Sequence, residues 1–287
     1  MMVLKIYDMH IHAGSEKIER NYLIEQMEKS GVYGAGLISA CPEDATADLY
    51  SLPFKERLNH VLEWSKGYEN RIIPILWIHP FEKDACEKVK VASQSGIRAF
   101  KIICDNFPVY CRENMLMLEA IEKTRLPILF HSGILWSGTD SSKYNRPIDW
   151  ECLLKFDDIK FSMGHCAWPW HDECIAVYGK FLHSYLERRS SEMFFDITPG
   201  TPRIYRKELI TKLFTVGYDV ENNIMFGTDS LANDYNPEWV KGWLETDRAI
   251  MDELEITEEQ REKIYEKNFM RFLCNEKVEH VLPHINK

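Results

Sequence analysis

Eight short apolar segments recur along the chain of 287 residues, and most of them precede a segment with helical periodicity. Their nearly continuous apolar character is typical of parallel strands that are buried on both faces. Eight such strand–helix units in about 270 residues are the usual content of a (β/α)8 barrel, so we predict a single α/β TIM-barrel domain over 1–287. The predicted strands cover 5–12, 32–39, 72–79, 97–104, 127–132, 159–165, 193–198 and 223–229. The predicted helices cover 16–30, 54–66, 82–94, 113–124, 172–188, 237–254 and 258–273.

A doubly wound open sheet is the alternative arrangement of alternating strands and helices. Its nucleotide-binding forms place a G-x-G-x-x-G or G-x-x-x-x-G-K-[ST] segment directly after a strand. Neither pattern follows any predicted strand of this chain. The barrel is therefore favoured.

The charge balance narrows the partners that this chain can have. The formal net charge is −10 without a run rich in lysine or arginine, whereas nucleic-acid binding needs a basic surface. No segment has the length and apolar character of a membrane span, and no secretion signal is recognisable. The eight cysteines include no C-x-x-C pair and fit reduced thiols. We expect a cytoplasmic protein that binds neither nucleic acid nor membranes, and the sequence leaves a homo-oligomer open.

Polar residues collect near the C-terminal ends of the predicted strands, where the mouth of a (β/α)8 barrel lies. Five of the ten histidines are at such positions. The residues at or near these ends are His10, His12, His79, Lys101, His131, His165, Asp196 and Asp229. Their common location predicts one shared site.

His10 and His12 lie two residues apart in the first predicted strand, so both side chains leave the same face. Two buried imidazoles without partners would carry a large desolvation cost. A divalent cation bound by both removes this cost, since neutral imidazole nitrogen is a good zinc ligand. We therefore predict a metal site here, with Asp8 on the same face as a deeper support.

Four further strand-end residues fit this metal site. His131 is a candidate third ligand, and Asp229 is a carboxylate that can complete the site and hold a proton. His165 is either a further ligand or an acid/base. Lys101 can pair with a carboxylate, bind substrate, or carry a carbamate that bridges two metals.

The loops after the strands are expected to decide the substrate, because they line the mouth of the barrel. The loops after strands five, six and seven offer aromatic and guanidinium groups, which suit a planar, anionic small molecule. The predicted substrate-binding residues are Trp136, Arg146, Trp168 and Arg203. Segment 134–150 is long enough to act as a lid. His79 and Asp196 are expected to support the metal or contact the substrate, and His171 is expected at the surface of a helix.

The pattern resembles the amidohydrolase superfamily, in particular its amidohydrolase-2 branch, which includes aminocarboxymuconate semialdehyde decarboxylase. The matching segments are DMHIH at 8–12, FHSG at 130–133, GHCAW at 164–168 and FGTDS at 226–230. IYEKNFMRFL at 264–273 is similar to the closing helix of this family. The segments occur in the family's order and cover essentially the whole chain.

The resemblance implies a divalent metal, usually zinc, bound by His10, His12, His131 and Asp229. It also implies an acid/base role for His165, as for the matching histidine of the decarboxylases. Lys101 is similar to the carboxylated lysine of binuclear members such as dihydroorotase. A binuclear site with Lys101 and His165 as added ligands is the alternative to the favoured site with one Zn²⁺ per chain. Mn²⁺ or another divalent ion is the alternative metal.

The predicted activity is hydrolysis of a C–N or C–O bond, in an amide or lactone, of a small anionic substrate by metal-activated water. Asp229 would accept the proton of this water, and His165 would stabilise the oxyanion or act as acid. The alternative is non-oxidative decarboxylation of an aromatic or muconate-type acid by the same residues. A non-catalytic metal-bound scaffold is the third hypothesis, which the acid/base residues disfavour.

Overall fold

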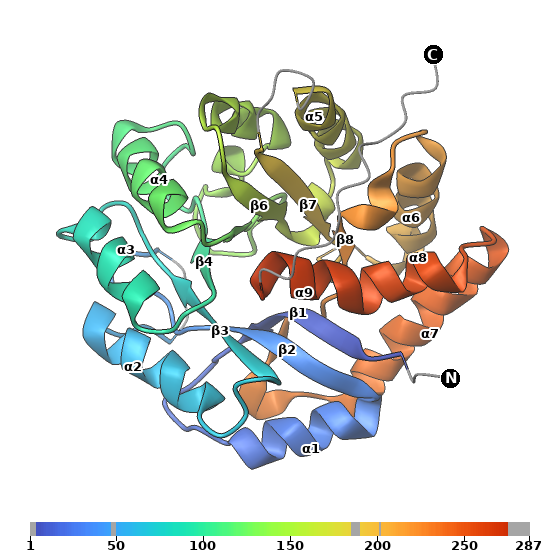
Figure 1. The fold of residues 1–287 in the computed structure, drawn as a ribbon, viewed down its shortest axis with the longest axis horizontal. Helices are drawn as coiled ribbons and strands as arrows, with labels where there is room; N and C mark the ends of the chain where they lie inside the picture. The colour runs from blue at the N-terminus through green and yellow to red at the C-terminus, as the bar shows by residue number, and fades with distance from the viewer. Residues whose placement is uncertain (1–3, 47–49, 185–189, 201, 275–287) are drawn as a thin grey trace.

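The strands of the protein form one parallel sheet that curls into a barrel, with helices around its outside (Figure 1). The computed structural model describes residues 4–46, 50–184, 190–200 and 202–274. The strands are β1 (Ile6–His12), β2 (Val32–Ile38), β3 (Ile72–Trp77), β4 (Ala99–Ile102), β5 (Ile128–Phe130), β6 (Lys160–Met163), β7 (Glu192–Asp196), β8 (Ile224–Met225) and β9 (Ser230–Leu231). The predicted (β/α)8 fold is confirmed.

The barrel closes through an eighth strand that is split in two. β8 pairs with β7, and β9 pairs with β1. Between these pairings, Met9 N donates to Phe226 O at 2.8 Å and Asp229 N donates to His10 O at 2.9 Å. One continuous strand over 223–229 is predicted, and this prediction is wrong because regular pairing stops where the chain delivers Asp229 to the mouth.

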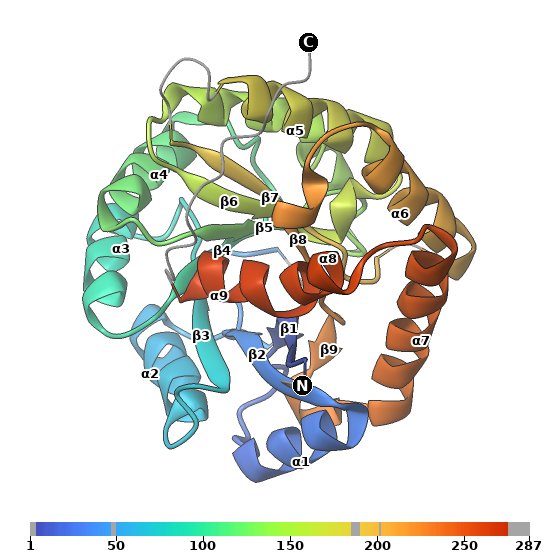
Figure 2. The same ribbon diagram turned by 45° about the vertical axis from the view of Figure 1, so that its right-hand side comes forward.

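Within the described part of the chain, seven longer helices surround the strands (Figure 2). Their apolar faces pack against the outer faces of the strands and form the larger core, in which Leu23, Trp64 and Phe181 are fully buried. A smaller apolar cluster that includes Met9, Ile75 and Leu129 fills the inside of the barrel. The helices are α1 (Arg20–Ser30), α2 (Phe54–Ser65), α3 (Ala85–Gln94), α4 (Arg112–Thr124), α5 (His171–Ser184), α6 (Arg206–Thr215) and α7 (Pro237–Glu253).

Some of the helices differ from the prediction. α1 begins at Arg20 rather than at residue 16, because the segment before it is held to the loop after β9 by Asn233 Nδ2, which donates to Ser15 Oγ at 2.5 Å and to Lys17 O at 2.8 Å. No helix is predicted behind β7, where α6 lies. The predicted helix over 172–188 corresponds to α5, and its last residues, 185–189, lie outside the described residues.

The N-terminal end of the barrel is covered by the last part of the described chain (Figure 2). This part consists of α8 (Glu258–Glu262), a π-helical turn η8 (Lys263–Lys267) and α9 (Asn268–Leu273). Phe269 stacks on Tyr7 of β1 with 4.5 Å between ring centroids. Asn268 Nδ2 donates to Ile224 O at 2.8 Å and so fixes α9 to the start of β8. This position agrees with the closing helix expected at 264–273.

The segment expected to be able to act as a lid, 134–150, contains short 3₁₀ helices, and its role as a lid stays a prediction. They are η1 (Ser142–Tyr144) and the first part of η2 (Pro147–Lys155).

None of the described helices combines the length and apolar character that a membrane crossing requires. The single domain, the cytoplasmic location and the oligomeric state stay predictions.

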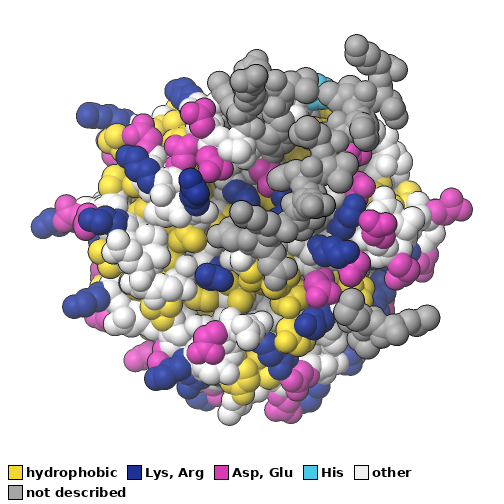
Figure 3. Space-filling view, in the orientation of Figure 1, with side chains coloured by type: hydrophobic (Ala, Val, Ile, Leu, Met, Phe, Trp, Pro, Cys, Tyr) yellow, Lys and Arg dark blue, Asp and Glu magenta, His cyan; other side chains and the backbone are white. Residues whose placement is uncertain are grey.

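Acidic and basic side chains alternate over the face seen in Figure 3. Many charged side chains of the described surface form exposed ion pairs, such as Lys29–Glu25 on α1 and Lys207–Glu253 between α6 and α7. Exposed pairs of this kind contribute about 0–1 kcal/mol each. The stability of the barrel must therefore come mainly from the buried core.

Candidate metal centre and active site

Two histidines and one aspartate meet at the C-terminal ends of the strands. His10 and His12 come from β1, and their Nε2 atoms lie 3.2 Å apart. Asp229, between β8 and β9, places Oδ1 at 3.4 Å from His12 Nε2 and 3.7 Å from His10 Nε2. One donor atom of each residue lies within 4.8 Å of the others. In the described part of the chain, this is the one group of three or more histidine, cysteine or acidic side chains that could hold a metal ion in this way. Three of the predicted ligands are thus brought together.

The backbone around Asp229 is held by a buried carboxylate, that of Asp8. Asp8 Oδ1 accepts from Thr228 N at 3.0 Å, and Asp8 Oδ2 accepts from Thr228 Oγ1 at 2.5 Å and from Tyr235 Oη at 3.1 Å. Burial raises the pKa of Asp8 to about 7. Asp8 therefore joins β1 to the Asp229 segment, as the deeper support expected from the sequence.

Asp196 of β7 fixes the ring of His10. His10 Nδ1 donates to Asp196 Oδ2 at 2.7 Å, and Asp196 Oδ1 accepts from Thr198 N at 2.8 Å. Although burial opposes ionisation, the contacts with His10 hold the pKa of Asp196 below its usual value. The proton of His10 is thereby kept on Nδ1, and the lone pair of Nε2 faces His12 and Asp229.

A glycine gives the strands room for this contact. A methyl group at Gly227 would overlap Thr198 Oγ1 and would lie 3.1 Å from His10 Cβ. The glycine of the FGTDS segment is therefore required by the close approach of β1, β7 and β8, and not by a positive φ angle.

We expect Asp196→Asn to lower the metal affinity of the protein by about 10–100-fold, because it removes the acceptor that orients His10. Competition with a chromophoric zinc chelator would measure this affinity. Asp157→Asn, an exposed change just before β6 at the other end of the barrel, is the matched control. An affinity within twofold of the wild type would contradict the orienting role of Asp196.

The imidazoles of His10, His131 and His165 are neutral in this environment. Burial, together with the charge of Lys101, lowers the pKa of His10 to about 3. Burial also lowers the pKa values of His131 and His165. The pKa of Asp229 is held well below its usual value, since its hydrogen bond to His12 and the nearby imidazoles outweigh the effect of burial. Neutral imidazoles and an ionised carboxylate are the forms that bind a metal.

His131 lies at the edge of this group. Its ring centroid is 5.0 Å from that of His165, and its Nε2 lies 3.2 Å from Ile134 O. Donation from Nε2 to this carbonyl leaves Nδ1 with a free lone pair. His131 is absent from the group of three whose donor atoms lie within 4.8 Å, so its role as a ligand stays a prediction.

His165 is presented by a left-handed turn, η3 (Gly164–Ala167), with φ angles of 60°, 43° and 55° at His165, Cys166 and Ala167. Its ring centroid is 5.1 Å from that of His10. Its Nδ1 is buried and has no hydrogen-bond partner among the described residues. Gly200 permits this placement, because a methyl group there would lie 2.7 Å from His165 Cγ. Backbone strain and an unpartnered nitrogen are typical of a functional group.

Lys101 of β4 lies fully buried beneath these residues, with Nζ at 3.2 Å from His10 Nε2. Burial lowers its pKa to about 8. The prediction that Lys101 belongs to the site is thus matched by its position. Its role as a carbamate ligand or as an unmodified amine stays a prediction.

The four predicted substrate-binding residues lie on the loops but have different partners. Trp136 is 77% exposed and stacks on Trp168 with 6.2 Å between ring centroids. Arg146 pairs with Glu173 and lies 4.5 Å from the centroid of the Trp170 ring. Arg203 lies over the rings of two tryptophans of α7, Trp239 and Trp243. Substrate contacts by these residues stay predictions.

Two other histidines have structural partners. His79 is fully buried, and its Nε2 donates to Asp105 Oδ1 at 3.2 Å while its Nδ1 accepts from Phe81 N at 3.3 Å. Both ring nitrogens are thus used in holding loops. His171 is only 6% exposed, and its Nδ1 donates to Cys166 O at 3.0 Å. The expectation of a surface position for His171 is wrong, because it anchors the start of α5 beneath the η3 turn.

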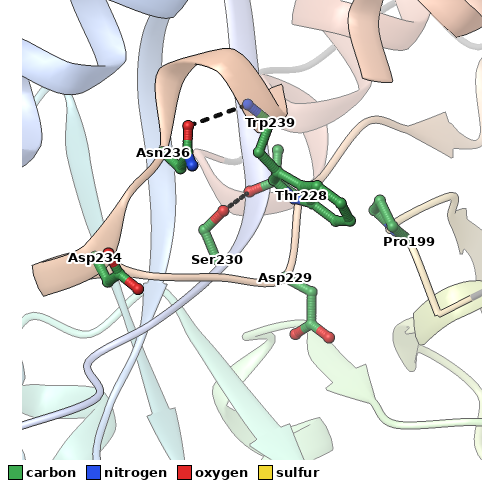
Figure 4. Close-up of a pocket in the computed structure, with 7 residues that line it drawn as sticks. All are labelled: Pro199, Thr228, Asp229, Ser230, Asp234, Asn236 and Trp239. Carbon is green, nitrogen blue, oxygen red and sulfur yellow. Dashed lines mark hydrogen bonds between the residues drawn. The ribbon is translucent and has the colours of Figure 1, made fainter. Parts of the chain in front are cut away.

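A cavity of about 310 Å³ opens beside Asp229. In Figure 4 the ring of Trp239 lies toward Pro199, with Asp229 and Asp234 on the other sides of the hollow. The Asp229 side chain is 37% exposed, so its carboxylate can be reached from outside. Residues that line the cavity are Pro199, Thr228, Asp229, Ser230, Asp234, Asn236 and Trp239. Sequence reasoning missed Asp234 and Trp239, whose only signal is their place in the loop after the eighth strand and at the start of α7.

The donor set of His10, His12 and Asp229 fits a divalent metal. Two neutral nitrogens and one carboxylate oxygen suit Zn²⁺ well, and a second carboxylate orients one of the imidazoles. A parallel barrel with this donor set at the C-terminal ends of its strands defines a TIM-barrel protein of the metal-dependent hydrolase type. A family model described as Amidohydrolase (Amidohydro_2) matches residues 7–273, and the chain therefore belongs to the amidohydrolase-2 family.

Similar solved structures share the fold at low sequence identity. The chain has a TM-score of 0.64 and 10% identity to a protein from Acinetobacter baumannii described as probable 2-pyrone-4,6-dicarboxylic acid hydrolase, with coverage of 94% of this chain and 99% of the other. For dihydroorotase from Campylobacter jejuni the TM-score is 0.58 at 16% sequence identity, and the match covers 96% of this chain and 85% of the other. For amidohydrolase 2 from Bifidobacterium longum subsp. infantis the TM-score is 0.57 at 12% sequence identity, and the match covers 96% of this chain and 100% of the other. A sequence search of curated proteins returned no match.

Proposed function

We propose that the protein is a metal-dependent hydrolase that cleaves a C–N or C–O bond of a small molecule. The observation that carries this proposal is the grouping of His10, His12 and Asp229 at the barrel mouth, with Asp196 behind His10. Family membership supports the same chemistry. The open cavity beside Asp229 is large enough for part of a small substrate.

The residues proposed to hold one Zn²⁺ per chain are His10, His12, His131 and Asp229. When bound, a divalent metal lowers the pKa of water toward about 7 and polarises a carbonyl group. His10 and His12 would contribute Nε2, and the free lone pair of His131 is on Nδ1. Mn²⁺ or another divalent ion with the same ligands is the alternative.

Asp229 is proposed as the group that moves the proton. Its carboxylate is ionised and partly exposed to the cavity, so it can accept the proton of an attacking water and return it to the leaving group. His165 is proposed to donate a hydrogen bond to the carbonyl oxygen as negative charge develops on it, or to act as acid. Its position beside His10 and its unpartnered Nδ1 support this role.

Trp136 and Trp168 are proposed to form an aromatic edge of the substrate site. Their rings are stacked with an interplanar angle of 12°, and Trp168 also lies 6.2 Å from the Tyr205 ring. Because planar groups stack well on such rings, this edge suits a planar substrate.

A binuclear site that adds Lys101 carbamate and His165 is the alternative metal arrangement. The metal content of the protein purified without chelator, measured by ICP-MS, distinguishes the two. We expect about one metal per chain, and Lys101→Met is expected to keep it, as is the control Lys160→Met at the other end of the barrel. About two metals per chain, reduced by Lys101→Met alone, would show the binuclear site. No metal, and no uptake of Zn²⁺ or Mn²⁺, would overturn the proposal.

The reaction class is tested by measuring two kinds of product in parallel. Hydrolysis of amides and lactones would be followed beside CO₂ release from aromatic and muconate-type acids. We expect hydrolysis that is lost with the metal. Metal-dependent CO₂ release without hydrolysis would overturn the proposal in favour of the decarboxylase alternative.

A further inference from the structure

The cavity beside Asp229 carries a second carboxylate, that of Asp234, which the proposed reaction does not use. Asp234 belongs to η7 (Ala232–Asp234) in the loop after β9 and lines the same cavity as Asp229 (Figure 4). Its side chain is exposed, and no ion pair or hydrogen bond engages its carboxylate within the described residues. No lysine or arginine is among the residues that line the cavity. Apart from the metal proposed at Asp229, this part of the site is therefore negatively charged, and no basic side chain that lines it is a counter-ion to Asp234.

The two arginines on the neighbouring loops do not supply that counter-ion. Arg146 is held by Glu173, whose carboxylate also accepts from Ile148 N at 2.9 Å. The Arg203 guanidinium lies 4.9 Å from the ring centroid of Trp243. A methyl group at Gly242 would lie 2.9 Å from Arg203 Nη2, so this guanidinium packs onto α7 itself. Neither guanidinium is among the groups that line the cavity, although Arg203 lies 5.9 Å from the ring centroid of Trp239 in its wall.

The aromatic wall of the cavity is fixed in place. Trp239 is 45% exposed and lies edge-on to Trp243, with 5.6 Å between ring centroids. Asn236 caps α7, because its Oδ1 accepts from Glu238 N at 3.0 Å and from Trp239 N at 3.2 Å. A capped helix start and the contact with Trp243 hold the Trp239 ring ready for a planar group.

We infer that this cavity selects a planar group with N–H donors, neutral or cationic, next to the bond that is cleaved, and disfavours a carboxylate there. Asp234 accepts from the N–H groups, and Trp239 stacks on the plane. The inference rests on the proposed function and narrows it to an amide- or amidine-type nitrogen compound. It differs from the anionic substrate expected from the sequence, because the two arginines behind that expectation are engaged elsewhere.

Three small probes of equal shape test this selection: benzamidine, benzamide and benzoate, which carry charges of +1, 0 and −1. Their dissociation constants would be measured by calorimetry on the metal-loaded protein. Asp234→Asn keeps the side-chain size and removes the charge. Asp157→Asn makes the same change on the exposed surface at the other end of the barrel.

We expect Asp234→Asn to weaken benzamidine binding by about fivefold, as for the loss of one charge-assisted, partly exposed pair. It should change benzamide binding by less than about twofold and leave benzoate unchanged or bound more tightly. Trp239→Ala should weaken both benzamidine and benzamide, and benzamidine at least as much as benzamide, since a tryptophan face stacks on planar groups and also attracts a cation. Asp157→Asn should change none of the three.

Benzamidine affinity within twofold of the wild type in Asp234→Asn would overturn the inference. The same holds if Asp234→Asn weakens benzoate as much as benzamidine. Failure of the proposed function would look different. A protein that hydrolyses no amide or lactone but binds benzamidine through Asp234 would lose the proposed reaction and keep the selective cavity.

Discussion

Asp229→Asn is expected to lower the rate of hydrolysis by about 10²–10⁴-fold, the usual contribution of a positioned acid/base group. The carboxylate of Asp229 lies 3.4 Å from His12 Nε2. Among His10, His12 and Asp229, Asp229 is the one whose side chain also lines the cavity. Asparagine keeps an oxygen for the metal but cannot accept a proton. kcat and kcat/KM should both fall, because the interaction is made in the transition state.

Metal analysis separates the two roles of Asp229. If Asp229→Asn retains at least half of the metal and still loses the rate, proton transfer is the dominant role. If the metal is lost as well, the rate should be compared at saturating Zn²⁺. Asp157→Asn should keep the rate within twofold. An Asp229→Asn protein with full rate and full metal content would remove Asp229 from the chemistry.

The grouping of His10, His12 and Asp229 was predictable because strand periodicity is a local property. His10 and His12 share a face of β1 by the period of two, and Asp229 follows the last apolar segment. In a parallel barrel all strands end at the same mouth, so residues far apart in sequence can be assigned to one site. The fold and the grouping of these three residues therefore follow from the short-range sequence pattern and one topological rule.

The contacts of the other mouth residues were less predictable, because they depend on side-chain directions. Asp196 is at a strand end like other candidates, but its bond to His10 Nδ1 depends on the distance between β1 and β7. Arg146 and Arg203 follow strands on loops near the mouth, yet Glu173 and the tryptophans of α7 draw them aside. No pattern in a single sequence specifies which of several nearby groups a long side chain will contact.

The same limit applies to the split eighth strand. Its apolar residues predict one strand, whereas the carboxylate of Asp8 accepts from both the backbone and the hydroxyl of Thr228. The next residue, Asp229, has a φ of 57°. A tertiary hydrogen bond here overrides the local preference for an extended strand, and this gives the acidic residue its place in the mouth.

Asp247→Ala is expected to lower the free energy of unfolding by about 3–5 kcal/mol, because it leaves a buried guanidinium without its partner. Arg206 of α6 binds Asp247 of α7 with two bonds, Nε to Oδ1 at 2.7 Å and Nη2 to Oδ2 at 2.6 Å. Both side chains are at most 1% exposed. Urea denaturation followed by circular dichroism would measure the loss.

Glu253→Ala is the matched control, since the Lys207–Glu253 pair joins the same two helices but its side chains are 60% and 57% exposed. It should cost about 0–1 kcal/mol. Replacing both buried partners, as in R206M/D247L, should be less harmful than Asp247→Ala, because no charge is left buried. A loss below about 1 kcal/mol in Asp247→Ala would contradict the assignment of this pair as a buried ion pair. Arg206 also donates to Ile197 O, next to Asp196, so R206M/D247L should bind metal more weakly even if it folds stably.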